Sequence, residues 1–561
     1  MKSTELSTSS HALLSVFETA GIDRVFLVPG ESYLGILDAL ADFPGIDVVT
    51  CRHESGAGFM ACADGRLTRR PGVVMVSRGP GATNASIAVH AAQQDGIPLI
   101  LVVGQVPAAD LRKEAFQEID YQQMYRSIAK WVVEVTDAQQ LAVAAFKAVR
   151  IAVEGTPGPV VLVVPEDIQQ QAVPQPEWAV TRRLPAQPAQ SLVDRVADAL
   201  STARKPLIIA GGEFDQEGGR EALLGLAEEF NIPVALSFRR HDIFPNGHRL
   251  FVGDLGLVNP SEQIDAFSSS DLILALGTRL GDITTQGYRF PALPKASQTL
   301  VHVHSDARNI GLHFSPDIGI ACDVVAFSQQ LAQRGEALDK YPHDDWTEEL
   351  KEIHQRIAKW PTLQTSDGVP FVSVVRCLAE VLPKDGVVCL DAGTFAAPVY
   401  RHFEFAYPQR MMASLSGAMG YGAPAAVATQ LRFPHRKVVC LVGDGGFLMT
   451  GNEMMAAVER NLPILFVLSN NNCFGSIRVH QEREYPRREH RGTTLVNPDF
   501  IALARSFGVE AELVNEVGEI DAALDRGLAA NRPYFVEVRS SLDAILPNRN
   551  DTLSSRDRSG D

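Results

Sequence analysis

The sequence lacks the features that would place the protein in a membrane, outside the cell or on nucleic acid. No apolar run in its 561 residues approaches the length of a membrane-spanning helix, and the longest runs include 98–103 and 159–164. The N-terminal residues are polar, so we expect no secretory signal. Acidic side chains outnumber basic ones by 67 to 51, and the net charge of −16 disfavours nucleic-acid and membrane partners.

The pattern of cysteines excludes two further classes of protein. The chain has seven cysteines, an odd number, and no two of them form a C-x-x-C pair. This disfavours a disulfide scaffold and a zinc site, and it is typical of free thiols in a reducing compartment. We therefore expect a cytoplasmic protein.

The sequence does contain a long series of short apolar runs. Hydrophobic residues make up 45% of the chain and charged residues 21%, as in ordinary globular proteins. The runs are continuous, which indicates strands buried on both faces, and amphipathic stretches lie between them. This alternation predicts an α/β fold with three doubly wound parallel-sheet domains. The runs lie at 25–28, 73–77, 98–104, 159–164, 206–211, 233–237, 272–277, 300–305, 386–391, 437–443, 463–469 and 534–538.

Two Pro/Gln-rich or charged stretches, at 169–190 and 335–367, are predicted to separate the domains. We therefore expect three domains, which we name N-terminal, central and C-terminal. Their predicted limits are 1–170, 191–340 and 366–547.

The strongest indication of chemistry lies in the last third of the chain. The run at 437–443 ends in a turn that contains Asp444, and the next run ends in three asparagines that include Asn471. Ligands bind beyond the carboxyl ends of parallel strands, so one strand-helix-strand unit puts the two side chains next to each other. A carboxylate and an amide oxygen suit Mg²⁺ holding a diphosphate, and Gly445 and Gly446 let phosphate approach the backbone. Taken alone, each piece is more often a plain turn or a cap.

Two glutamates have simple local interpretations. Thr450 and Glu453 have the spacing of a capping box in the helix after Asp444. In the first third, a predicted strand from residue 47 leads into a helix start at Glu54. Without further context, Glu54 is an acid in the first turn, where the helix dipole favours it.

The spacing of Asp444 and Asn471, 27 positions (471 minus 444), resembles the cofactor motif of thiamine-diphosphate-dependent enzymes. In that family the metal binds the Asp, the second Asn and a main-chain carbonyl two residues later. The resemblance therefore implies Mg²⁺ bound by Asp444, Asn471 and the carbonyl of Cys473. It also implies that Glu54 lies against N1′ of the aminopyrimidine and promotes formation of the C2 ylide.

Further segments are similar to acetolactate synthases, and the similarity covers nearly the whole chain. It implies a catalytic role for Gln117 and a position for Met419 between the two cofactor rings, although a lone Met is usually a core residue. For Thr394 and Phe395, a loop after a strand is an equal alternative to cofactor contact. The implied cofactor-binding residues are Gly30, Glu54, Thr394, Phe395, Gly417, Met419, Asp444, Gly445, Gly446 and Asn471.

The sequence departs from acetolactate synthases in the substrate and flavin sites. His480 stands where those enzymes have a Trp in the substrate pocket, and Ser476 stands where they have a Met. We expect a more polar pocket with His480 as a catalytic candidate, and a solvated helix histidine is an equal alternative. The family's central domain binds FAD, but the Arg expected after 276–282 is Ile283, which disfavours FAD without excluding it.

The resemblance predicts a carboligase or decarboxylase that acts on a 2-oxo acid through the ylide and an enamine. The alternatives are a C–C lyase acting on a 2-hydroxy ketone or an acyl thioester, an aldehyde-forming decarboxylase, and a cofactor-binding scaffold without turnover. Glu54 favours an enzyme, because a scaffold needs no proton-relay glutamate. The two half-sites belong to different subunits in this family, so the resemblance implies a homodimer or homotetramer.

Overall fold

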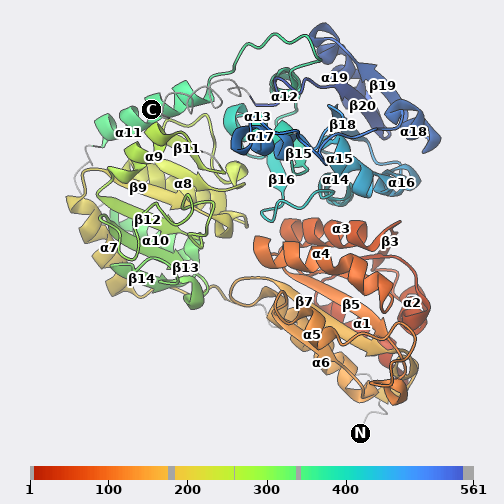
Figure 1. The fold of residues 1–561 in the computed structure, drawn as a ribbon. Helices are drawn as coiled ribbons and strands as arrows, with labels where there is room; N and C mark the ends of the chain where they lie inside the picture. Colours follow the sequence, from red (N-terminus) through yellow and green to blue (C-terminus); the bar gives the residue numbers. More distant parts are fainter. Residues whose placement is uncertain (1–5, 175–183, 258, 336–342, 547–561) are drawn as a thin grey trace.

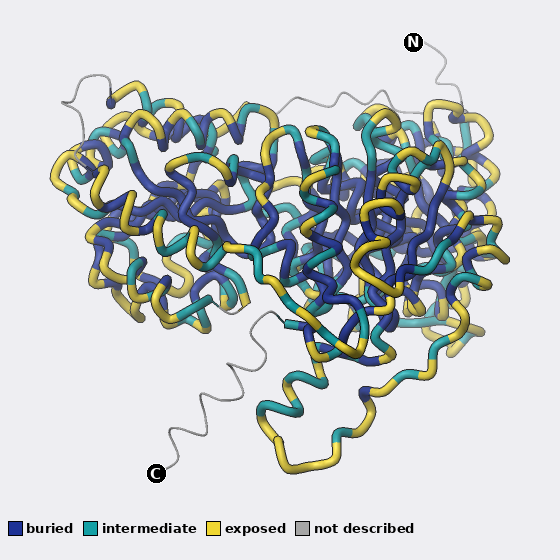
Figure 2. Tube along the Cα trace, turned by 90° about the horizontal axis from the view of Figure 1, so that it is seen from above, coloured by how far each residue is buried: buried dark blue, intermediate teal, exposed yellow. Residues whose placement is uncertain are grey.

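The computed structural model describes residues 6–174, 184–257, 259–335 and 343–546. In these residues, three six-stranded parallel sheets follow one another along the chain, each covered by helices (Figure 1). Buried residues run through the sheets, and exposed residues lie on the outer helices and loops (Figure 2). The predicted α/β class with three doubly wound domains is confirmed, and the limits of the domains stay predictions.

The N-terminal domain contains one parallel sheet and a short antiparallel pair. Its strands are β1 (Leu6–Thr8), β2 (Arg24–Leu27), β3 (Asp47–Thr50), β4 (Gly72–Val76), β5 (Leu99–Gln105), β6 (Trp131–Glu134), β7 (Pro159–Pro165) and β8 (Ala172–Pro174), and its helices are α1 (Ser9–Thr19), α2 (Leu34–Ala39), α3 (Glu54–Thr68), α4 (Pro80–Asp95), α5 (Tyr121–Tyr125) and α6 (Ala138–Val153). The sheet order is β3-β2-β4-β5-β7-β6, and β1 pairs with β8. Strands β4, β5 and β7 are buried throughout, as continuous apolar runs require.

The central domain has the sheet order β11-β10-β9-β12-β13-β14. Its elements are β9 (Pro206–Ala210), β10 (Val234–Ser237), β11 (Phe251–Leu255), β12 (Leu272–Leu276), β13 (Thr299–His304), β14 (Ile318–Ala321), α7 (Gln190–Thr202), α8 (Gly219–Phe230), α9 (Ser261–Ser268) and α10 (Val324–Gly335). The chain builds outward from β9 and then crosses to β12. The switch point, where a ligand of such a sheet binds, therefore lies between β9 and β12.

The C-terminal domain repeats this plan with the order β16-β15-β17-β18-β20-β19. Its elements are β15 (Val387–Leu390), β16 (Arg410–Ala413), β17 (Val438–Gly443), β18 (Ile464–Asn470), β19 (Glu510–Val514), β20 (Tyr534–Arg539), α12 (Phe371–Val381), α13 (Ala397–His402), α14 (Gly422–Arg432), α15 (Asp444–Thr450), α16 (Met454–Glu459), α17 (Gly475–Glu484), α18 (Phe500–Ser506) and α19 (Ile520–Ala529). Its switch point lies between β15 and β17, where the chain reverses direction across the sheet.

The second predicted linker, 335–367, is not wholly a linker. Helix α11 (Asp344–Ala358) lies within it and packs on the central domain. Trp346 is buried there, and its Nε1 donates a hydrogen bond to Pro206 O at 2.9 Å. The charged composition that suggested a linker belongs to the exposed face of this amphipathic helix.

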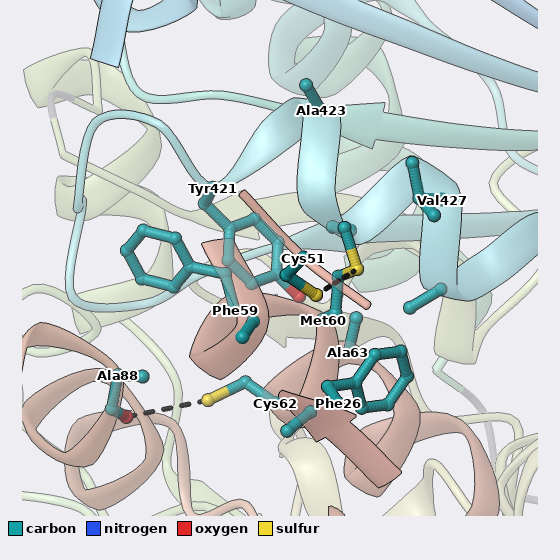
Figure 3. Packing of buried hydrophobic residues seen from close by; sticks show 14 of the residues in the cluster. Phe26, Cys51, Phe59, Met60, Cys62, Ala63, Ala88, Tyr421, Ala423 and Val427 are labelled. Carbon is teal, nitrogen blue, oxygen red and sulfur yellow. Dashed lines mark hydrogen bonds between the residues drawn. The ribbon is translucent and has the colours of Figure 1, made fainter. Parts of the chain in front are cut away.

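The N-terminal and C-terminal domains share one hydrophobic core. Helix α3 packs against α14, and small side chains let the two helices approach closely (Figure 3). The Phe59 ring meets the Tyr421 ring edge-on with a centroid distance of 5.7 Å. This packing brings the start of α3 close to the segment that follows α15.

Candidate active site

The predicted metal residues lie at the carboxyl ends of β17 and β18, next to the switch point of the C-terminal sheet. Asp444 follows β17 and begins α15, and Asn471 follows the neighbouring strand β18. Both accept hydrogen bonds from one backbone amide, because Cys473 N lies 3.3 Å from Asp444 Oδ2 and 3.1 Å from Asn471 Oδ1. The structure therefore brings the predicted pair together.

The environment of Asp444 is suited to a cation. The carboxyl group is buried, and burial raises its pKa, although hydrogen bonds from Gly445 N at 2.8 Å and Asn497 Nδ2 at 2.9 Å oppose this rise. Asn497 Oδ1 is buried beside it and has no hydrogen-bond partner among the described residues. A charge that is costly to bury and a cluster of oxygen ligands fit Mg²⁺.

Asn497 is a member of this cluster that was not predicted from the sequence. Its amide also donates to Asn470 Oδ1 at 2.9 Å and to Asn472 Oδ1 at 3.3 Å. It thereby ties the loop before α18 to the end of β18. The sequence offers one signal for Asn497, the proline that follows it, and an Asn-Pro pair is typical of loops in general.

The carbonyl of Cys473 is a better ligand candidate than its thiol. Burial raises the pKa of this free cysteine, so the thiolate that a metal requires is disfavoured. The carbonyl oxygen accepts one hydrogen bond, from Gly475 N at 2.8 Å, and keeps a second lone pair.

There is no room for a side chain at Gly445 or Gly446, the two glycines after Asp444. A Cβ on Gly445 would lie 2.4 Å from the Phe474 ring and 3.4 Å from Met419 Cε. A Cβ on Gly446 would lie 2.9 Å from Asp391 Oδ1. Glycine is therefore required at both positions, because Phe474, Met419 and Asp391 pack directly against this stretch of backbone.

Asp391 fixes the turn that carries Gly417 and Met419. The residue follows β15 and is buried, and burial raises its pKa to about 6. Its carboxylate accepts hydrogen bonds from Gly420 N at 3.0 Å and from Gly422 N at 3.1 Å. Gly417 has a φ of +66°, and a Cβ added to it would meet open space. Asp391 thus holds the turn at Gly420 and Gly422, whereas Gly417 borders open space.

The two residues after Gly393 differ in what they contact. Thr394 N donates a hydrogen bond to Ser476 Oγ at 3.0 Å, which joins this edge to α17. The Phe395 side chain turns into the core and packs edge-on against Phe371 with centroids 5.8 Å apart. The predicted cofactor contact of Phe395 is therefore restricted to its backbone or its exposed edge.

His480 lies on α17, four residues after Ser476, so the two share a face of the helix. The His480 side chain is exposed in the single chain, and Arg483 Nη2 donates to its Nδ1 at 2.8 Å. The contact of Ser476 with Thr394 shows that this helix face borders the site.

Glu54 begins α3 at the carboxyl end of the N-terminal sheet. His53 caps the helix, because its Nδ1 accepts a hydrogen bond from Ser55 N at 3.2 Å. Glu54 Oε2 accepts a hydrogen bond from Asn84 Nδ2 at 3.0 Å. A Cβ on Gly81 would lie 3.3 Å from Glu54 Oε1, so α4 begins close beside the carboxylate.

Gly30 and Gln117 lie at the same sheet edge. A Cβ on Gly30 would lie 2.5 Å from Ser77 Cβ, so the loop after β2 packs directly on the loop after β4. Gln117 has a φ of +65°, its backbone packs on Gly79, and its side chain is exposed. Tyr121 Oη accepts a hydrogen bond from Gly79 N at 2.8 Å and supports this segment from below.

The expected capping box is wrong. Thr450 ends α15 and its hydroxyl donates to Gly420 O at 2.7 Å. The Glu453 carboxylate accepts hydrogen bonds from the N-terminal domain instead. Contacts between distant segments thus take both side chains away from their local partners.

The two halves of the site do not meet within the described chain. No hydrogen bond or ion pair joins Glu54 to Asp444 or Asn471 in this part of the protein. Large hydrophobic side chains are exposed in the segments around both halves. They are Ile87, Phe116, Leu448, Met449 and Ile477, with exposed fractions between 37% and 79%.

The carboxyl edge of the central sheet is filled by the chain itself. A Cβ on Gly211 would lie 2.3 Å from Gly277 O, and one on Gly212 would lie 2.7 Å from Arg240 Nε. The cavity that touches Gly212 has a volume of about 50 Å³. Ligand pockets of the size that FAD needs span roughly 300–1,000 Å³. This cavity is therefore too small for FAD, and FAD binding stays a prediction that the sequence disfavours.

Buried ion pairs join all three domains at the same place. Arg66 of α3 lies 3.1 Å from Asp215, and Arg220 and Arg410 lie 3.3 and 3.0 Å from Asp242. Burial alone would raise the pKa of Asp215, but Arg410, Arg66 and Arg220 outweigh it and hold the pKa well below its usual value. Asp215 and Asp242 are therefore ionised, and both are paired with neighbouring arginines.

Comparison with known proteins identifies the family. Residues 7–124, 193–331 and 391–538 match the N-terminal TPP binding domain, the central domain and the C-terminal TPP binding domain of thiamine pyrophosphate enzymes, respectively. The large subunit of acetolactate synthase isozyme 3 from Escherichia coli is 31% identical, over 92% of both chains. The chain belongs to the thiamine pyrophosphate enzyme family.

Other acetolactate synthases show the same likeness. The large subunit from Lactococcus lactis is 28% identical over 96% of this chain and 94% of its own length. A probable large subunit from Methanocaldococcus jannaschii is 28% identical over 96% of this chain and 93% of its own. The predicted resemblance is confirmed, and the protein is a thiamine-diphosphate-dependent enzyme. In the residues that the structure describes, no helix has the length and apolar character needed to cross a membrane.

Proposed function

We propose that this thiamine-diphosphate enzyme also requires Mg²⁺ and acts on a 2-oxo acid as a carboligase or decarboxylase. The observation that carries the proposal is the meeting of Asp444, Asn471 and the Cys473 backbone at the carboxyl ends of β17 and β18. Asp444 Oδ2, Asn471 Oδ1 and the Cys473 carbonyl would hold the metal, and the Gly445–Gly446 backbone would receive the diphosphate.

Other residues of the two half-sites have separate roles in the proposed reaction. Thiamine diphosphate, when bound, supplies a nucleophilic carbon and an electron sink beside a carbonyl group. Glu54 holds and moves a proton at N1′ of the aminopyrimidine, and Met419 supports the rings beside Gly445. Gln117 and His480 contact the substrate from the two half-sites.

The active form is a homodimer or a dimer of dimers. Glu54 and Asp444 share no hydrogen bond or ion pair among the described residues of one chain, and the hydrophobic side chains around both halves are exposed. Covering these side chains with a second copy buries apolar surface and brings Glu54 of one copy to the Asp444 edge of the other.

The test of this function is the exchange of the cofactor's C2 hydrogen with deuterium, followed by NMR after an acid quench. Glu54→Gln keeps a hydrogen bond but cannot transfer the proton, so we expect exchange to slow by about 10²- to 10⁴-fold. Wild-type exchange in this variant would contradict the assignment. A panel of 2-oxo acids, acyloins and acyl thioesters with product identification then separates carboligase from lyase and aldehyde-forming decarboxylase.

Mixing two inactive variants tests the shared site. A heterodimer of Glu54→Gln and Asp444→Ala chains has one site with both defects and one intact site. Random exchange should restore about a quarter of wild-type activity, because half of the dimers are mixed and each has one working site. If mixing restores nothing, although subunit exchange is shown by mass, each site belongs to a single chain.

A further inference from the structure

Glu453 connects the two half-sites within one chain. It ends the short helix η9 (Gly451–Glu453), which follows α15, and its side chain is fully buried. Its Oε1 accepts hydrogen bonds from Arg52 N at 3.0 Å and from His53 N at 2.9 Å. These two residues directly precede Glu54. A carboxylate of the C-terminal domain therefore binds the backbone that leads into α3.

The first turn of α3 is shaped around this carboxylate. A Cβ on Gly56 would lie 2.5 Å from Glu453 Oε1 and 2.6 Å from its Cγ. Any side chain at this position would displace either the carboxylate or the helix start. His53, which Glu453 holds through its amide, is also the residue that caps α3. Fixing His53 thus fixes the direction in which the helix begins.

The cost of burying Glu453 indicates that its contacts matter. Burial raises the pKa of its carboxyl group to about 7, against the hydrogen bonds from Arg52 and His53 that favour the charged form. Glu54, next to the bound amides, also raises this pKa. The positive end of the α3 dipole faces the carboxylate and offsets part of the cost.

We infer that Glu453 is a positioning residue for Glu54. It holds the start of α3 so that the Glu54 carboxyl group keeps the orientation required at the aminopyrimidine of a cofactor bound by a second copy of the chain. This inference rests on the proposed function and on the shared site. Glu453 is nine residues after Asp444 (453 minus 444). In the homodimer, one rigid segment would thus serve Glu54 in one site and the metal in the other.

The test uses the purified holoenzyme with thiamine diphosphate and Mg²⁺. In Glu453→Ala we expect C2 exchange to slow by about 10- to 100-fold, because a displacement of about 1 Å costs this much in a positioned group. The affinity for thiamine diphosphate, measured by calorimetry, should stay unchanged, because the Asp444 edge sets it. Glu453→Gln keeps the shape and one acceptor oxygen and should restore most of the rate.

Two further variants separate positioning from general stability. Gly56→Ala keeps Glu453 but displaces either its carboxylate or the start of α3, so exchange should slow as in Glu453→Ala. Glu459→Gln removes a surface partner of the Arg52 side chain, 3.1 Å away, and should change nothing. If Glu453→Ala does not fold, Gly56→Ala decides the question.

The inference is overturned if Glu453→Ala or Gly56→Ala folds and exchanges at the wild-type rate. It is also overturned if exchange falls only in proportion to cofactor affinity, which is the result of a purely structural role. These failures are distinct from failure of the proposed function. The function fails if the wild-type enzyme does not exchange the C2 hydrogen or if Glu54→Gln does not slow it.

Discussion

The central and C-terminal sheets have the same architecture, but the side chains at the carboxyl ends of their strands differ. Both sheets have six parallel strands with a switch point near the middle. At the C-terminal edge, Asp444 and Asn471 accept hydrogen bonds but have no cationic partner among the described residues. At the central edge, Asp215 and Asp242 are bound by arginines from all three domains.

The difference shows that the fold determines where a ligand can bind, and that the side chains at the edge determine whether it does. An edge with a buried carboxylate, amide oxygens and bare glycines attracts a cation and a diphosphate. An edge whose carboxylates are already paired gains nothing from a ligand and serves to join domains. Removing a carboxylate should therefore weaken cofactor binding at the C-terminal edge and lower stability at the central edge.

Asp444→Ala should have the largest effect on the C-terminal edge. Removing the one carboxylate among the proposed ligands should lower the affinity for thiamine diphosphate and Mg²⁺ by more than the roughly 10–100-fold typical of outer-shell residues. Retention of the cofactor after dialysis, measured by fluorescence of its thiochrome derivative, checks this. Asp525→Ala removes an exposed carboxylate on α19 of the same domain and should leave retention unchanged. Full retention in Asp444→Ala would contradict the metal assignment.

At the central edge, Asp242→Asn should reduce stability rather than cofactor binding. The Asp242 side chain is fully buried between Arg220 and Arg410, which lose a charged partner in the variant. Breaking such a pair costs about 3–5 kcal/mol. We expect a lower temperature for the first unfolding transition and an unchanged affinity for thiamine diphosphate in the folded protein. Glu262→Gln, which removes an exposed pair with Arg356, should cost less than about 1 kcal/mol.

The strands that the sequence predicted and those that it missed differ in position. All the apolar runs named in the sequence analysis form strands, and all of these are inner strands of the sheets. The missed strands of the six-stranded sheets, which are β6, β11, β14, β16 and β19, are all at sheet edges. An edge strand has a neighbour on one side only and is less uniformly apolar, and β14 alternates between buried and exposed residues. Its signal is therefore weaker than that of a strand buried on both faces.

The same reason explains which site residues could be predicted. Asp444 and Asn471 are each fixed by the end of a strand, and strand ends can be located from local sequence. Glu453 and Asn497 act on segments that are distant in the chain or lie across a loop, and no local pattern records such a contact. The capping-box interpretation of Glu453 was wrong because a tertiary contact replaced the local one.

His480→Trp tests the acceptor side of the C-terminal edge. A large apolar wall would replace a hydrogen-bonding one on the helix face that Ser476 shares. Preference should shift from acceptors with a hydroxyl or carboxylate group toward a plain 2-oxo acid by about 1–3 kcal/mol. The ratio of kcat/KM values for two competing acceptors measures this shift. His435 lies just before β17, at the amino ends of the strands of the same sheet. His435→Trp should therefore leave the ratio unchanged. An unchanged ratio in His480→Trp would place His480 outside the pocket.

Glu213→Gln should give the smallest effect, and its sign depends on pH. Burial raises the pKa of Glu213, in the loop after β9, to about 7, although Ser305 donates hydrogen bonds that lower it. An acid whose pKa is raised on folding contributes stability at low pH and loses it as the pH rises through the folded value. Wild type should therefore become less stable between about pH 5 and pH 8, and the neutral Gln should not.

The charged groups around Glu213 leave this sign unchanged. His304, 3.3 Å away, has its pKa lowered to about 4 by burial, so it stays neutral across this range. Arg69 lowers the pKa of Glu213 and Asp323 raises it, and both act more weakly than burial. Glu213→Gln should thus be more stable than wild type by about 1–2 kcal/mol at pH 8.5 and by nothing at pH 5, measured by thermal unfolding at both values. Glu217→Gln, at an exposed position in the same loop, should show no such difference. An equal gain at both pH values would show that packing, not charge, limits the stability of the central edge.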